Sequence, residues 1–147
     1  MSQEFSGGCY CGNITIVFKT EQDASDLTPR ECDCGFCRRN GAEWVSDPQG
    51  RIDIAVMNEA ALSLYEQGSK LARFWICQRC GTTTAVTAEI NGKLHGAVNA
   101  NCLEGAEKLG QSEPASPKTL SDYEKRIRWE DLWTSETIVK EAWDVGL

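Results

Sequence analysis

Eight cysteines, seven of them in tight clusters, are the feature of this sequence that most limits its fold. The clusters are Cys9-Tyr10-Cys11, Cys32-Asp33-Cys34-Gly35-Phe36-Cys37 and Cys77-Gln78-Arg79-Cys80, and Cys102 stands alone. A disulfide framework spreads its cysteines to link distant loops, whereas thiols two or three residues apart can bind one metal ion. The spacing therefore predicts a fold held together by zinc, which proteins bind through groups of thiolates.

Two of the clusters predict one closed zinc site. Side chains at positions i and i+2 of a strand point the same way, so Cys9 and Cys11 can face one ion. Cys77 and Cys80 belong to a C-x-x-C-G turn, in which Gly81 can adopt the positive φ that a Cβ disfavours. Four thiolates are the usual ligands of a structural zinc. This ion would tie the start of the chain to a central hairpin and contribute to the free energy of folding.

The third cluster supplies three thiolates, from Cys32, Cys34 and Cys37. Three protein ligands with one open position are the composition of a catalytic zinc, which can bind a thiol and lower its pKa. These cysteines are therefore the candidate catalytic residues. Arg38 and Arg39 follow directly, and they could offset the thiolate charge or bind a substrate carboxylate. The sequence does not separate these two roles.

Two further residues could change this division. Cys102 could be a fourth ligand of the second zinc, which would make both ions structural. The pattern favours a buried free thiol instead, because Cys102 lies outside any chelating pair. His95, the only histidine, is a candidate ligand or base, but its flanking residues favour a place in the core of a strand.

The remaining pattern predicts a mostly β, largely antiparallel single domain spanning residues 1–147. Its core is expected at about 5–105, followed by a loop-rich, partly helical tail over 106–147. The strands are expected at residues 14–19, 43–46, 51–56, 62–67, 71–77, 82–90 and 93–103. Asp47-Pro48-Gln49-Gly50 is typical of a turn and Asn91-Gly92 of a tight hairpin. In the tail, Ser121 or Asp122 could cap a short helix, and Trp129, Trp133 and Trp143 are expected to be packing residues.

Length and charge exclude several classes of protein. A chain of 147 residues fits one domain, and its net charge of −7 argues against nucleic acid as the main partner. Lys125, Arg126 and Arg128 form a local basic patch, which we interpret as solvated surface. No apolar run approaches the roughly 20 residues of a membrane span, and the start lacks the pattern of a signal peptide. These features predict a cytoplasmic protein.

At this point the ordered motifs resemble one known family. They are Gly7-Gly8-Cys9-Tyr10-Cys11-Gly12, Cys32 to Arg38 with Gly41, Phe74 to Gly81, and Val98 to Leu103. This order is similar to that of the glutathione-dependent formaldehyde-activating enzyme (GFA) family, which includes the centromere protein V group. The resemblance spans roughly residues 5 to 105.

The resemblance implies a β-tent fold with one structural and one catalytic zinc, held by the two cysteine sets above. It also implies a carbon–sulfur lyase that joins formaldehyde reversibly to glutathione to give S-hydroxymethylglutathione. The implied partners are a small thiol such as glutathione and an aldehyde. Two residues depart from the family pattern: Asp33 stands where many members have histidine, and Gly35 where many have serine. The alternatives are a non-catalytic zinc-folded binding module and, less favoured, a zinc-buffering or redox-sensing protein.

Overall fold

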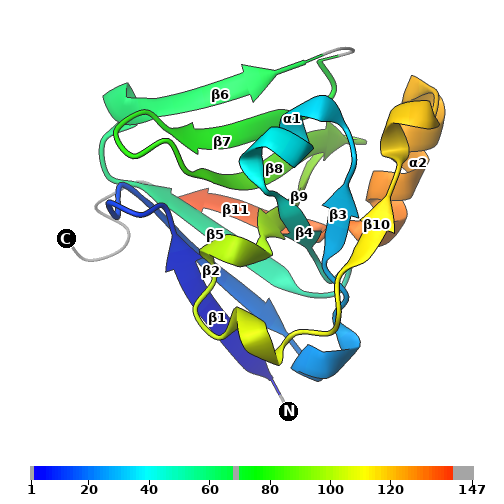
Figure 1. The fold of residues 1–147 in the computed structure, drawn as a ribbon, viewed down its shortest axis with the longest axis horizontal. Coiled ribbons are helices and arrows are strands. Elements are labelled where there is room, and N and C mark those ends of the chain that lie inside the picture. The colour runs from blue at the N-terminus through cyan, green and yellow to red at the C-terminus, as the bar shows by residue number, and fades with distance from the viewer. Residues whose placement is uncertain (1, 68–69, 141–147) are drawn as a thin grey trace.

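Two β-sheets make up most of the chain in a computed structural model that describes residues 2–67 and 70–140 (Figure 1). The strands are β1 Gln3–Gly8, β2 Ile14–Thr20, β3 Arg30–Cys32, β4 Glu43–Val45, β5 Arg51–Val56, β6 Leu62–Glu66, β7 Arg73–Cys77, β8 Thr83–Ile90, β9 Lys93–Asn99, β10 Glu113–Ala115 and β11 Glu136–Lys140. The α-helices are α1 Gly35–Asn40 and α2 Asp122–Leu132. Short 3-10 helices lie at Ala24–Asp26, Glu59–Ala61, Ala100–Cys102, Ala106–Lys108 and Pro117–Thr119. The mostly β fold predicted from the sequence is confirmed.

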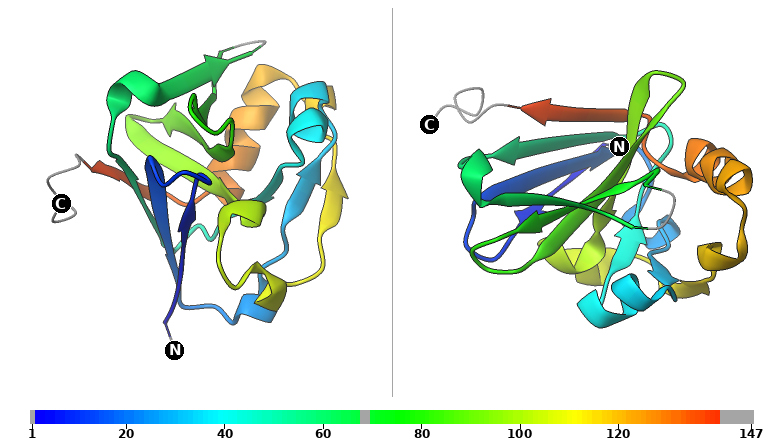
Figure 2. Two further views of the ribbon diagram at one scale, coloured as in Figure 1. Left: turned by 60° about the vertical axis from the view of Figure 1, so that its left-hand side comes forward. Right: turned by 90° about the horizontal axis from the view of Figure 1, so that it is seen from above.

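The smaller sheet has the strand order β1-β2-β5-β11, and the larger has the order β10-β3-β4-β9-β8-β7-β6. Most neighbouring strands are antiparallel, but β10 runs parallel to β3 and β11 runs parallel to β5. The two views of Figure 2 show the sheets facing one another, with α2 at one side of the larger sheet. Within the described ranges, no helix is both long and apolar enough to cross a membrane.

The centre of the larger sheet is buried on both faces, because alternate residues of one strand point to opposite sides. In β8, Ala85 packs with residues of the smaller sheet such as Ile16 and Ile54, whereas Val86 packs with Trp44 and Trp133 on the other side. The first cluster fills the space between the sheets. The second lies beneath α1 and α2; it includes Cys37, and Cys32 and Cys34 pack against it.

Local turn signals in the sequence match the structure closely. Asn91 and Gly92 both have positive φ, of 54° and 77°, as a tight hairpin turn between β8 and β9 requires. The amide of Gly50 donates to the carbonyl of Asp47, which closes the predicted turn before β5. Ser121 caps α2 in a reciprocal capping box with Glu124.

Other expectations need correction. The strand expected over 93–103 ends at Asn99, and Cys102 lies in a short 3-10 helix. The tail is more than loop and helix, since β10 and β11 add a strand to each sheet. Trp129 and Trp133 pack as expected, with ring centroids 4.7 Å apart, while Trp143 lies outside the described residues.

Candidate metal and active site

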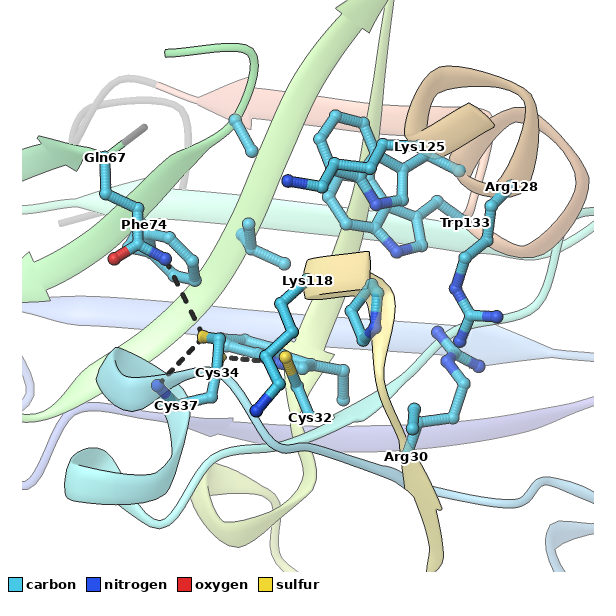
Figure 3. Close-up of a pocket in the computed structure, with 16 residues that line it drawn as sticks. Arg30, Cys32, Cys34, Cys37, Gln67, Phe74, Lys118, Lys125, Arg128 and Trp133 are labelled. Carbon is cyan, nitrogen blue, oxygen red and sulfur yellow. Dashed lines mark hydrogen bonds between the residues drawn. The ribbon is translucent and has the colours of Figure 1, made fainter. Parts of the chain in front are cut away.

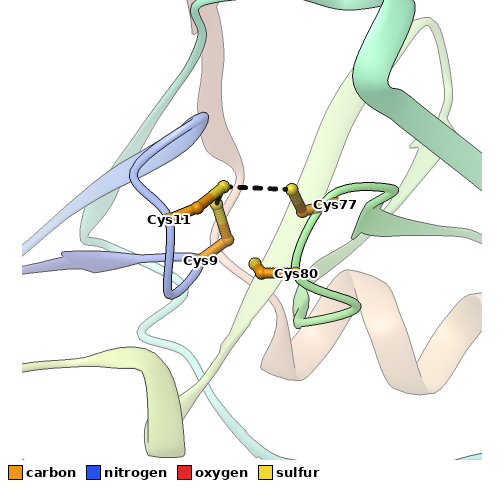
Figure 4. Close-up of side chains that lie close together, drawn as sticks. All are labelled: Cys9, Cys11, Cys77 and Cys80. Carbon is orange, nitrogen blue, oxygen red and sulfur yellow. Dashed lines mark hydrogen bonds between the residues drawn. The ribbon is translucent and has the colours of Figure 1, made fainter.

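Cys9, Cys11, Cys77 and Cys80 come together from two turns (Figure 4). The first pair lies in the connection between β1 and β2, closed by a hydrogen bond from Gly12 N to Cys9 O. The expectation that this pair lies on a strand is therefore wrong, because β1 already ends at Gly8. A turn still brings both thiols to one side.

The second pair forms the turn that its sequence predicted. Cys77 ends β7, and Gly81, with φ of 77°, turns the chain back into β8. The amide of Gly81 donates to the carbonyl of Cys77 at 2.8 Å. This closed turn presents the thiols of Cys77 and Cys80 toward the first pair.

The geometry of these four sulfurs fits a tetrahedral zinc. Four Zn–S bonds of about 2.3 Å place the sulfurs about 3.8 Å apart. The Cys11 Sγ atom lies 3.8 Å from Cys9 Sγ and 3.5 Å from Cys77 Sγ. The four ligand atoms lie within 4.8 Å of one another. Without an ion, burial raises the pKa of Cys9 to about 11, so binding must displace a proton from this thiol.

Cys32, Cys34 and Cys37 form the second group, with all three sulfurs within 4.8 Å of one another. Cys32 is the last residue of β3, Cys34 caps the N-terminus of α1, and Cys37 is buried in the first turn of that helix. The sequence suggested a loop here. A short helix forms instead, and it ends at Gly41 in the left-handed conformation.

Several N–H groups point at these sulfurs. The Trp44 indole Nε1 donates to Cys37 Sγ at 3.4 Å, and the Cys37 backbone amide donates to Cys34 Sγ at 3.3 Å. The Gln67 amide nitrogen lies 3.7 Å from Cys34 Sγ. Such donors stabilise thiolates and hold them in place, as outer hydrogen bonds do around metal ligands.

Contact between two of these thiols shifts their pKa values in opposite directions. The contact with the Cys37 thiol lowers the pKa of Cys32 to about 6, and the pKa of Cys37 is raised by this contact and by burial. A thiol with a lowered pKa is largely ionised at neutral pH, and the thiolate is the form that binds a metal. In the part of the chain that the structure describes, no fourth cysteine, histidine or carboxylate joins this group. Three thiolates are one ligand short of the four that a tetrahedral zinc binds.

A pocket of about 360 Å³ opens beside the three thiols (Figure 3). Its apolar walls come from the larger sheet and from α2, where the stacked rings of Trp129 and Trp133 face the cavity. The lining residues are Arg30, Cys32, Cys34, Cys37, Trp44, Gln67, Ala72, Phe74, Val86, Ala115, Pro117, Lys118, Lys125, Arg128, Trp129 and Trp133. This volume lies within the range of small-molecule sites.

Asp33 links the pocket rim to the thiol group. Its Oδ2 atom accepts a hydrogen bond from the Ser116 hydroxyl and lies 3.7 Å from Lys118 Nζ. Asp33 thus ties the segment after β10 to the turn between Cys32 and Cys34. Its carboxylate does not belong to the three-thiol group.

Arg38 and Arg39 are both exposed on α1, and neither lines the pocket. Arg39 instead donates to the carbonyl of Gly35 at 3.0 Å. Their role in substrate binding stays a prediction. The cations that line the pocket are Arg30, Lys118, Lys125 and Arg128.

Cys102 and His95 lie outside both metal groups. Cys102 is directed at the carbonyl of Thr83, 3.5 Å away, and burial raises its pKa to about 11. His95 is buried in β9, with Nδ1 3.0 Å from the carbonyl of Lys93. His95 is thus buried as expected, whereas Cys102 is only half-buried and belongs to neither hydrophobic cluster.

Sequence reasoning missed the pocket wall formed by α2. We interpreted Lys125 and Arg128 as solvated surface, but they line the pocket together with Trp129 and Trp133. Their spacing of three and four residues places them on one face of a helix, and this signal was present in the sequence. Arg126 lies off that face and is exposed. Gln67 carried no comparable signal, because its position depends on the fold.

Comparison with known proteins gives two matches. The model of the family described as glutathione-dependent formaldehyde-activating enzyme matches residues 4–116. A crystal structure of a Rhodobacter sphaeroides protein, from a structural genomics programme, matches with 30% identity and a TM-score of 0.53. That match covers 74% of this chain and 99% of the other. Curated proteins gave no match.

Proposed function

Because the chain belongs to the glutathione-dependent formaldehyde-activating enzyme family, we propose that it joins a thiol such as glutathione reversibly to an aldehyde such as formaldehyde. The observation that carries the proposal is the position of three cysteine sulfurs in the wall of a pocket large enough for a small molecule. A purely structural metal site would need no such cavity.

The proposed reaction forms one carbon–sulfur bond. The sulfur of the thiol adds to the carbonyl carbon, and the π electrons of the C=O bond move to its oxygen. The proton lost by the thiol is balanced by the proton gained by this oxygen, which gives S-hydroxymethylglutathione from glutathione and formaldehyde. The reverse reaction breaks the same bond.

Zinc fits the three-thiol group, with Cys32, Cys34 and Cys37 as its ligands. When bound there, it would supply Lewis acidity that lowers the pKa of a substrate thiol, so that the thiol is ionised at neutral pH. The donors on Cys34 and Cys37 hold the ligand sulfurs in place. Trp129, Trp133 and Lys118 line the pocket. We assign the two tryptophans to restricting water on one side and the Lys118 ammonium to donating the proton to the product oxygen.

The test replaces one thiol with a hydroxyl in Cys34→Ser. This variant should keep its fold, lose one of two zinc ions per chain and lose catalysis. The measurements are zinc content and the rate of glutathione–formaldehyde exchange by NMR, corrected for the spontaneous reaction. Cys102→Ser is the matched control, because Cys102 lies outside both groups, and it should keep both ions and full activity.

Two results would contradict the proposal. One is a Cys34→Ser variant that exchanges as fast as the unchanged protein. The other is a zinc-loaded protein that accelerates no thiol–aldehyde reaction, which would favour the non-catalytic binding module.

A further inference from the structure

Three cations line the pocket without a carboxylate partner in the described part of the chain: Arg30, Lys125 and Arg128. We propose that they form an anion subsite that binds a carboxylate of the substrate thiol, so that this protein acts on acidic thiols. The substrate part of this inference rests on the proposed function. The anion subsite itself is tested independently below.

The two guanidinium groups come from different parts of the fold. Arg30 lies on β3, two residues before Cys32, and Arg128 lies on α2. Figure 3 shows the two groups directed toward one another at one side of the pocket. Two like charges directed toward one another repel, and an anion bound between them would offset this cost.

A hydrogen bond to Ser46 holds the Arg30 side chain in position. Its Nη2 atom donates to the Ser46 hydroxyl at 2.8 Å, and that hydroxyl donates to the Leu132 carbonyl at 2.6 Å. A guanidinium has five N–H donors, so several stay available for a ligand. The chain thus holds a half-buried cation at the pocket without neutralising it.

The fourth cation of the pocket differs. Lys118 lies 3.7 Å from the Asp33 carboxylate, so its charge is partly offset. Arg51, Arg73 and Lys140 likewise pair with carboxylates elsewhere. Other surface cations of the described chain also lack a carboxylate partner, but Arg30, Lys125 and Arg128 are distinguished by lining one pocket together in a chain whose net charge is −7. Distant acidic residues weaken this local attraction little, because salt screens charges beyond about 8 Å.

Two of the three subsite cations lie outside the family match, whereas Arg30 lies inside it. The match ends at residue 116, whereas α2, which supplies Lys125 and Arg128, begins at Asp122. The helix therefore adds a charged wall to the pocket of the three thiols. A ligand that spans this pocket would carry a thiol at one end and a carboxylate at the other, as glutathione does.

The test measures binding of S-methylglutathione, which keeps both carboxylates but has no free thiol. Isothermal titration calorimetry measures the binding, and the zinc-loaded protein is used throughout. Arg128→Gln should weaken binding roughly tenfold or more, the effect of losing a charged hydrogen bond. Arg126→Gln removes the same charge from an exposed position of the same helix and should leave binding within about twofold.

A kinetic experiment tests whether the subsite binds the carboxylate of a reacting thiol. Arg128→Gln should raise KM for 3-mercaptopropionate and leave KM for the uncharged 2-mercaptoethanol unchanged. Equal effects of Arg126→Gln and Arg128→Gln on S-methylglutathione binding would overturn the proposal, as would no binding by the unchanged protein.

The two proposals can fail separately. If binding depends on Arg128 but no thiol reacts with an aldehyde, the anion subsite stands and the lyase proposal falls. If exchange is catalysed and Arg128→Gln alters neither binding nor KM, the lyase stands and the subsite falls.

Discussion

At the scale of single residues, hydrogen bonds to the cysteine sulfurs distinguish the three-thiol group. Around the three-thiol group the donors come from the indole of Trp44, the amide of Gln67 and the first turn of α1. Each donor favours the charged form of the sulfur and restricts its position. We therefore expect the metal affinity of this group to depend on residues that are not ligands.

Trp44→Phe tests this dependence. The substitution keeps an aromatic ring in the core but removes the Nε1–H that donates to Cys37 Sγ. We expect the affinity of the three-thiol group for zinc to fall about 10- to 100-fold, as for other outer hydrogen bonds of metal sites. Competition with a chromophoric chelator measures the change.

Trp75→Phe is the control for this prediction. It makes the same change at another buried tryptophan, whose Nε1 donates to the Thr87 hydroxyl at 2.8 Å, away from the three thiols. It should lower the melting temperature and leave zinc affinity unchanged. Equal zinc affinities in both variants would show that the Trp44 bond does not tune the metal group.

At the scale of elements, short segments carry the candidate site. Cys32 ends a strand of three residues, and the helix with Cys37 spans six. The sequence predicted which thiols belong together, because spacings of two and three residues bring ligands together in a turn or a helix alike. It did not predict the elements themselves, because segments this short have no periodicity to detect.

The tight turns were predictable for a local reason. Asn91, Gly92 and Gly81 adopt a positive φ, which few other residues favour. The local sequence alone therefore predicts these turns. In contrast, β11 pairs in parallel with β5, about 85 residues earlier, and a three-residue β10 pairs with β3. Pairing over such separations depends on the whole fold. For the same reason the sequence did not bring Arg30 and Arg128 to one pocket.

At the scale of the whole molecule, the four-thiol group links the two sheets. Cys9 and Cys11 follow a strand of the smaller sheet, whereas Cys77 ends β7 of the larger sheet and Cys80 lies in the turn between β7 and β8. An ion held by all four would restrain the sheets as a disulfide would. The three-thiol group lies on the opposite face of the larger sheet, with the pocket. This arrangement favours different roles for the two groups: the four-thiol group stabilises the fold, and the three-thiol group serves the pocket.

Cys11→Ser tests this division. It removes one ligand of the four-thiol group, and we expect a loss of several kcal/mol in the free energy of unfolding. Cys34→Ser removes one ligand of the other group and should change the melting temperature far less. Thermal unfolding with zinc analysis of both variants makes the comparison. Equal destabilisation would contradict the assignment of the fold-stabilising role to one group.

The most direct test of the account is a crystal structure of the zinc-loaded protein with glutathione. We predict zinc held by Cys32, Cys34 and Cys37, with the glutathione sulfur as the fourth ligand and a carboxylate between Arg30 and Arg128. A fourth ligand supplied by the protein itself, or a three-thiol group without zinc in fully loaded protein, would contradict the proposed thiol chemistry.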